Sequence, residues 1–146
     1  MNEAVQRLET PEECEQFIKN VQKKYPDLAL EAHRKAVELR AEKHGVKTTV
    51  EHELLRAVYA YEEALSAKKG RKTRASRTWQ MIDRHGIINA ADKIVKRKNA
   101  TLGYKTLIEM NMQDFAFESV VLRYPDSFEP ATVDRAKARL DELKHA

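Results

Sequence analysis

The apolar positions near the start of the chain recur at the spacing of an α-helix. Thr10, Pro11 and Glu13 form a helix start, because Thr10 can cap the helix, Pro11 suits its first position and Glu13 completes the capping box. The predicted helix runs to about Lys24, where Tyr25-Pro26-Asp27 interrupts the pattern. Its inner positions, three or four residues apart, are Cys14, Phe17, Ile18 and Val21.

Two longer helices follow in the first half of the chain. Residues 27–44 are rich in Ala, Leu, Glu, Lys and Arg, which are good helix formers, and Gly45 suits the backbone conformation that closes a helix. A third helix starts with Thr48 or Thr49 as its cap and ends at Lys69-Gly70. Its inner positions are Val50, Leu54, Val58, Tyr61 and Leu65.

The second half predicts shorter helices. Residues 78–85 and 87–98 form two of them, separated by one glycine, and residues 101–110 form another. Asn111 or Gly103 can supply the special backbone angles at the ends of this third helix. The inner positions of the 87–98 helix are Ile87, Ala91, Ile94 and Val95.

Residues 112–124 are apolar around most of a helical circumference, as expected of a central helix packed on several sides. The Val120-Val121 pair also permits a strand, but a lone strand would leave its backbone groups unpaired, so we predict a helix. Pro130 then begins a terminal amphipathic helix. Its inner positions are Val133, Ala136, Leu140 and Leu143.

These elements predict an all-α bundle of about seven to eight helices. We expect an acidic three-helix array over residues 1–70, a basic linker over 71–77 and a C-terminal helical bundle over 78–146, together forming one compact unit. The content of four Gly and four Pro is too low for a β-sandwich or barrel with many tight turns.

Composition also bears on the compartment. The single cysteine, Cys14, cannot form an internal disulfide, which fits a reducing environment. The N-terminus lacks the basic start and apolar stretch of a signal peptide, and no apolar run reaches the length of about 20 residues that spans a bilayer. We therefore expect a cytoplasmic protein with no membrane partner.

Positive charge is concentrated in one segment. Residues 68–105 hold twelve Lys and Arg against only Asp83 and Asp92, while each flank has a net charge of −3. The densest part, residues 68–77, has six cations in ten residues and is followed closely by the only tryptophan, Trp79. A block of this kind favours a polyanionic partner, and nucleic acid is the leading candidate.

The leading hypothesis is therefore a non-enzymatic protein that binds the phosphate backbone of nucleic acid with little sequence preference, and we favour DNA over RNA as its partner. Trp79 or Tyr104 would be available to stack on an exposed base. The expected binding residues are Lys68, Lys69, Arg71, Lys72, Arg74, Arg77, Lys93, Lys96 and Arg97.

Two other interpretations apply to the same segment. It can be a solvated loop whose cations pair with the acidic flanks, with Trp79 as an ordinary core anchor. It can also contain a helix-turn-helix, formed by residues 78–85, Gly86 and residues 87–98. In that alignment Asp92 occupies a position where a recognition helix normally buries an apolar residue, so the match is partial.

The sequence offers little support for catalysis or cofactor binding. His52 lies between Glu51 and Glu53, but neighbouring helical positions point about 100° apart and cannot chelate one metal together. His85, after Asp83 and Arg84, resembles a general acid or base, although the helix dipole favours cations at that end anyway. No nucleotide-binding loop or nucleophile elbow occurs. We expect no metal and no cofactor, and we favour a protein that is not an enzyme.

The competing function is that of a protein-protein adaptor or homo-oligomer. Met110, Met112, Phe115 and Phe117 could line a groove for a partner helix, while the basic loop docks on an acidic protein surface. The same four residues also suit the core of a protein of this size.

Two stretches carry a resemblance to a known type of domain. Residues 70–88, which read GRKTRASRTWQMIDRHGII, and residues 112–118, which read MQDFAFE, resemble an uncharacterised bacterial helical domain found beside restriction-type nucleases. The resemblance implies a helical fold and an association with DNA. It attaches no activity and no functional residue.

Overall fold

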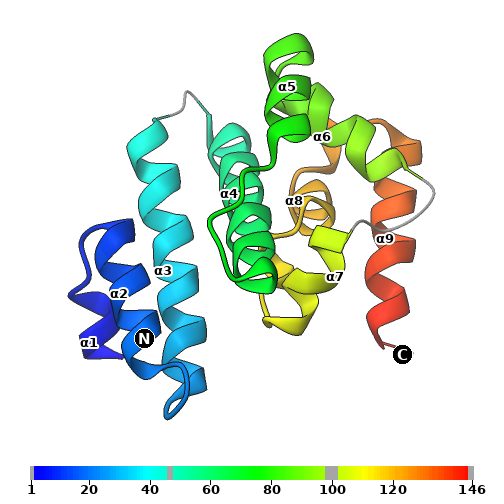
Figure 1. Cartoon of the computed structure of the whole chain (residues 1–146). Helices are drawn as coiled ribbons and strands as arrows, with labels where there is room; N and C mark the ends of the chain where they lie inside the picture. The colour runs from blue at the N-terminus through cyan, green and yellow to red at the C-terminus, as the bar shows by residue number, and fades with distance from the viewer. Residues whose placement is uncertain (1, 46–47, 98–101, 145–146) are drawn as a thin grey trace. The chain divides into compact units, whose positions relative to one another are not determined.

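In the computed structural model, residues 2–45, 48–97 and 102–144 are described, and they form α-helices, two short 3₁₀ helices and the loops between them. No strand occurs in these ranges, so the predicted all-α fold is confirmed. The chain divides into two compact units, residues 1–45 and 46–146 (Figure 1). No helix within the described ranges is both long enough and apolar enough to cross a membrane.

The first unit contains α1 (Glu3–Gln6), α2 (Pro11–Val21) and α3 (Pro26–His44). The predicted cap of α2 is present, because the side chain of Thr10 accepts a hydrogen bond from the backbone N–H of Glu13 at 3.1 Å. Ile18 of α2 packs with Ala29 and Ala32 of α3 to form the core of the unit. The short α1 was not predicted from the sequence, since Val5 is its one buried residue.

The second unit is built around one long helix, α4 (Thr49–Lys69). This helix packs against α6, α7 and α8, as Figure 1 shows. Thr48 caps it by accepting a hydrogen bond from the N–H of Glu51 at 3.1 Å, and Gly70 ends it in the left-handed conformation. The elements after α4 are α5 (Ser76–His85), α6 (Ile87–Lys96), α7 (Leu102–Glu109), η1 (Gln113–Phe115), α8 (Phe117–Arg123), η2 (Pro125–Ser127) and α9 (Pro130–Lys144).

The unit boundary differs from the expected one at residue 70. Helix α4 belongs to the second unit, where Tyr61 stacks on Phe117 of α8 with ring centroids 5.1 Å apart and Arg123 pairs with Glu53 at 2.7 Å. The apolar spacing of α4 identifies its buried face but carries no information about which helices cover that face. The expected array over residues 1–70 is therefore divided after Gly45.

Residues 112–124 do not form the single helix that we predicted. The 3₁₀ helix η1 is followed by Ala116 in an extended conformation, with φ −60° and ψ 150°, and only then does α8 begin. The side chain of Ser119 stabilises this break, because its hydroxyl donates a 2.7 Å hydrogen bond to the carbonyl of Gln113. Asn111 has a φ of 56° and ends the preceding turn, as its sequence position suggested.

The inner face of α9 also differs from the prediction. Ala136 is buried, but its buried companions are Thr132 and Arg139, while Val133 and Leu140 are only half-buried. Arg139 is held inside by an ion pair with Glu118 of α8, so a polar pair occupies space that the apolar pattern assigned to leucines. The side chain of Leu143, together with residues Lys98 and Thr101 at the predicted helix ends, lies outside the described part of the chain.

Candidate nucleic-acid interface

The basic segment leaves α4 through a defined turn. Gly70 has φ 70° and ψ 18°, and the N–H groups of Gly70 and Arg71 both donate to the carbonyl of Ser66. This arrangement satisfies an end carbonyl of the helix and directs the chain back along α4. Residues 71–75 then connect α4 to α5.

Two polar side chains of α4 anchor this connection. The Ser66 hydroxyl accepts a hydrogen bond from the N–H of Thr73 at 2.8 Å and donates one to its carbonyl at 3.3 Å. One carboxylate oxygen of Glu62 accepts from the N–H of Ala75 at 2.9 Å and from the indole N–H of Trp79 at 2.7 Å. Helix α4 thus holds the linker in a defined conformation.

Trp79 joins α5 to α4. Its ring lies 5.5 Å from that of Tyr59, the guanidinium of Arg74 lies 5.7 Å from its centroid, and the side chain is half-buried. With its N–H bound to Glu62, the tryptophan acts as an anchor at the base of α5. The alternative suggested by the sequence, that Trp79 stacks on a base, would require its ring to leave this arrangement.

The cations of the loop differ in how they are engaged. Lys68 is 3.7 Å from Glu109 in an exposed pair, which contributes little to stability, and Arg74 lies over Trp79. A second group is exposed and pairs with no carboxylate within residues 2–45, 48–97 and 102–144. That group consists of Lys69, Arg71, Lys72 and Arg77.

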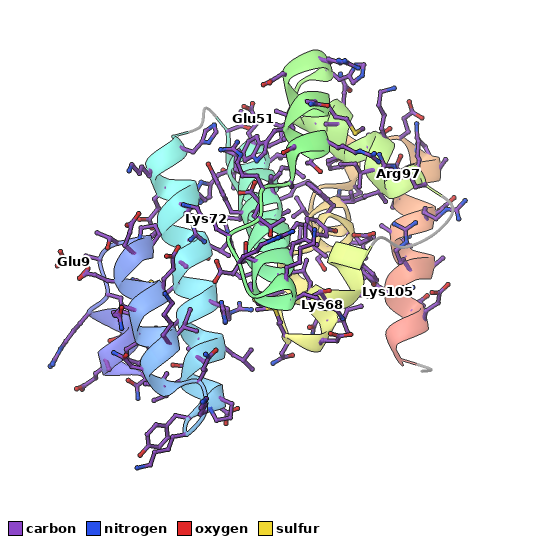
Figure 2. The ribbon with its side chains drawn as sticks, in the orientation of Figure 1. Glu9, Glu51, Lys68, Lys72, Arg97 and Lys105 are labelled. Atoms are coloured by element: carbon purple, nitrogen blue, oxygen red, sulfur yellow. The ribbon has the colours of Figure 1, made fainter. Side chains whose placement is uncertain are left out.

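The predicted cations on α6 and directly after it differ in their contacts. Lys96 is engaged with two carboxylates, Asp92 at 2.9 Å and Glu129. The hydrogen bonds that its ammonium donates to Glu129 and, to a smaller extent, to Asp92 raise the pKa of Lys96. Arg97 donates to the sulfur of Met81 at 3.6 Å, and Lys93 is exposed. Figure 2 shows Lys72 and Arg97 well apart in the second unit. Through its contact with Met81, Arg97 lies next to α5, which also carries Arg77, whereas the charge of Lys96 is already neutralised within the protein.

Both helices of the helix-turn-helix hypothesis are present, with Gly86 between them. Helices α5 and α6 are joined through Gly86, which has a φ of 80°, but α6 is part of the core. Its buried residues are Ala90, Ala91, Ile94 and Val95. These four residues lie on one face of α6, and a recognition helix also packs one face on its own domain, so their burial neither supports nor contradicts the helix-turn-helix hypothesis.

Asp92, the residue that did not fit the helix-turn-helix pattern, has a structural role. Its carboxylate accepts hydrogen bonds from the backbone N–H of Glu129 at 3.3 Å and the hydroxyl of Thr132 at 2.7 Å, next to the start of α9. Partial burial raises the pKa of Asp92, but these hydrogen bonds and that of Lys96 outweigh it, so the net pKa is lowered. Asp92 thus links α6 to the start of α9.

The residues proposed for an apolar partner groove lie in the core. Met110, Met112, Phe115 and Phe117 are each no more than 9% exposed. Among the described residues, no three His, Cys, Asp or Glu side chains are grouped so that they could hold a metal ion.

Two residues of the site were missed by sequence reasoning. Glu62 and Ser66 lie four positions apart on α4, and both contact the basic linker. A lone carboxylate and a lone serine in a helix carry no specific signal. The one available clue was that a tryptophan N–H normally finds an acceptor when it is buried.

Comparison with known proteins gives no match: no family model fits this chain, and no curated protein or solved structure is detectably similar to it.

Proposed function

We propose that this protein binds nucleic acid through its phosphate backbone, using the exposed cations of the segment that joins α4 to α5. The observation that carries the proposal is a group of four exposed cations within nine residues of chain that pair with no carboxylate of the described residues: Lys69, Arg71, Lys72 and Arg77. Surface cations placed together without carboxylates repel each other, and a polyanion relieves that repulsion while releasing its own counterions.

The anchoring of the linker supports the same function. Glu62 and Ser66 fix the backbone at Thr73 and Ala75, so the linker loses less conformational freedom on binding than a free loop would. The anchoring contacts use backbone groups and Trp79, and they leave the four cationic side chains exposed. Lys68 and Arg74 can add to the positive electrostatic potential, and losing their present contacts costs little free energy because those contacts are exposed.

Lys93 and Arg97 form a secondary contact region in this proposal. They lie on α6 and directly after it, and Figure 2 shows Arg97 well apart from Lys72 of the linker. Lys96 contributes little, because a phosphate would have to compete with Asp92 and Glu129. The main binding effect is therefore expected from the linker.

The test is fluorescence anisotropy of a labelled DNA duplex across a salt series, with a matched pair of variants. The linker variant carries K69Q, R71Q, K72Q and R77Q. The control carries R7Q, K19Q, K23Q and K43Q, which are exposed positions of the first unit. Each variant loses four positive charges, so both have a formal net charge of zero in place of +4.

If about four to six phosphates are neutralised, the logarithm of affinity falls with the logarithm of salt concentration at a slope of about −4 to −5. The linker variant should flatten this slope by about 3 to 4, while the control keeps the wild-type slope. Absence of binding at low salt, or equal behaviour of the two variants, overturns the proposal. Single-stranded DNA and duplex RNA in the same series identify the preferred form of nucleic acid.

A further inference from the structure

We infer that α5 is the element that enters the major groove of duplex DNA, presenting Arg77, Gln80 and Arg84 to the base edges. This inference rests on the proposed function and assigns the ligand more closely, as B-form duplex DNA contacted from its major groove. It replaces α6 by α5 as the helix that contacts the bases.

The first support is the exposure of α5. None of its ten residues is buried, although the helix has a distinct apolar side. Trp79, Met81 and Ile82 are half-buried, and α5 packs mainly on α6. Figure 1 shows α5 beside α6 at the edge of the second unit. A helix attached along one side in this way leaves its opposite side available to a large ligand.

The second support is the arrangement of side chains on the free side. Arg77, Gln80 and Arg84 are exposed and stand at i, i+3 and i+7, so they lie within about 60° of the helix circumference. From Arg77 to Arg84 the helix rises about 10 Å, which matches about three base-pair steps. Asp83 is also exposed. It points about 100° away from Arg84, but it stands three positions after Gln80 and about 60° from it, so a carboxylate borders this side of the helix next to Gln80.

Arg77, Gln80 and Arg84 form a stripe along α5, and their side chains can bind base edges as well as phosphates. A guanidinium can donate two hydrogen bonds to O6 and N7 of guanine, and a glutamine amide can pair with N6 and N7 of adenine. These edges of guanine and adenine face the major groove, which is about 12 Å wide and admits a helix of about 10 to 12 Å diameter.

The position of the linker agrees with this placement. Arg71 and Lys72 precede the N-terminus of α5, so they are placed to contact phosphates at the edge of a groove that holds the helix. Glu62 fixes both the end of the linker, at Ala75, and the base of α5, at Trp79. The phosphate contacts and the base contacts would therefore be set at a fixed spacing by a single side chain.

The experiment uses two duplexes of the same sequence. One is unmodified, and in the other every cytosine is replaced by glucosylated 5-hydroxymethylcytosine, which fills the major groove and leaves the phosphates unchanged. Wild-type protein should bind the glucosylated duplex at least about 10-fold more weakly, a difference comparable to the loss of one good base contact. Netropsin, which occupies the minor groove, should leave the affinity unchanged.

One variant and a matched control test whether Gln80 and Arg84 cause the difference in affinity between the two duplexes. Q80A/R84A should reduce the discrimination between the duplexes to within about two-fold while leaving most of the salt dependence, because the linker cations are intact. The matched control Q22A/K23A removes one exposed glutamine and one exposed cation from the first unit and should keep full discrimination. Far-ultraviolet circular dichroism confirms that each variant remains helical.

The outcomes separate this inference from the proposed function. Equal binding of the two duplexes by the wild type overturns the assignment of α5 and leaves the phosphate-binding proposal standing. Discrimination that persists in Q80A/R84A also overturns it, because another element would then occupy the major groove. If the wild type binds neither duplex at low salt, the proposed function fails and the assignment of α5 fails with it.

Discussion

Replacing Arg139 by methionine should be the most destabilising single polar substitution in the second unit. Arg139 and Glu118 are 5% and 2% exposed, and one guanidinium nitrogen lies 2.5 Å from a carboxylate oxygen of Glu118. The other terminal nitrogen donates to the carbonyl of Arg97, which ties the end of α6 to α9. This one side chain therefore connects three helices of the unit.

The magnitude follows from what R139M would leave behind. Glu118 would remain buried without its cation, and breaking such a pair costs about 3 to 5 kcal/mol. Its second oxygen, Oε1, is also buried and accepts no hydrogen bond from the described residues, so no existing partner compensates. The carbonyl of Arg97 would lose its donor as well, at about 1 kcal/mol. Against a typical total stability of about 5 to 15 kcal/mol, this loss is severe.

A double-mutant cycle tests the reasoning. The variants are R139M, E118M and E118M/R139M, unfolded in urea. Since the sole tryptophan, Trp79, lies in the second unit, its fluorescence reports the unfolding of that unit directly. The double variant replaces both charges by apolar side chains of similar length and should lie within about 1 to 2 kcal/mol of the wild type. The coupling energy between the two positions should then exceed about 2 kcal/mol.

Two results would refute this account. A coupling energy below about 0.5 kcal/mol would mean that Glu118 gains nothing from Arg139. A double variant as unstable as R139M would mean that the arginine stabilises the unit through its packing or its bond to Arg97, independently of the carboxylate.

Three further predictions concern the second unit. D92N should lower the free energy of unfolding by about 1 kcal/mol at neutral pH. Because the folded pKa of Asp92 lies below 3.8, this stabilisation is present above that pH and is lost as pH falls through the folded pKa, so urea midpoints of D92N and wild type should converge in acid. G103A should destabilise by about 1 to 3 kcal/mol in thermal denaturation, although alanine normally favours a helix, because its Cβ would lie 2.4 Å from the ring of Tyr61; increased stability would refute the clash. E62A should weaken binding of duplex DNA several-fold and alter Trp79 fluorescence, because the linker loses its anchor; unchanged affinity would show that the anchor is unimportant.

Local signals in the sequence predicted most helix ends correctly. Thr10 and Thr48 cap their helices through the expected backbone N–H groups, and Gly70 and Asn111 have the positive φ angles that their positions suggested. These signals succeed because a cap or a left-handed residue depends on the few residues around it. The all-α fold class followed from the same kind of information.

Features set by tertiary contacts were not accessible in this way. The break at Ala116 depends on a hydrogen bond between Ser119 and a backbone carbonyl, and the burial of Arg139 depends on a carboxylate 21 residues away. Likewise, α4 presents a buried face that the sequence identified, but its assignment to the second unit depends on which helices cover that face. The spacing of apolar residues identifies the positions that face inward, but it does not identify the residues of other helices that they contact.

The basic segment contains cations that other residues of the fold bind and cations that they do not bind, and the second group supports the proposed function. Lys96 is bound by two carboxylates and stabilises the contact of α6 with the start of α9, so its charge is explained by the fold. Arg71 and Lys72 lie between helices and pair with no acidic group of the described residues, so the fold gives no reason for their charge. Mutual repulsion makes such a group a net cost to the isolated protein. A cost of this kind in a linker that α4 holds in place is most simply explained by a ligand that supplies the missing negative charge.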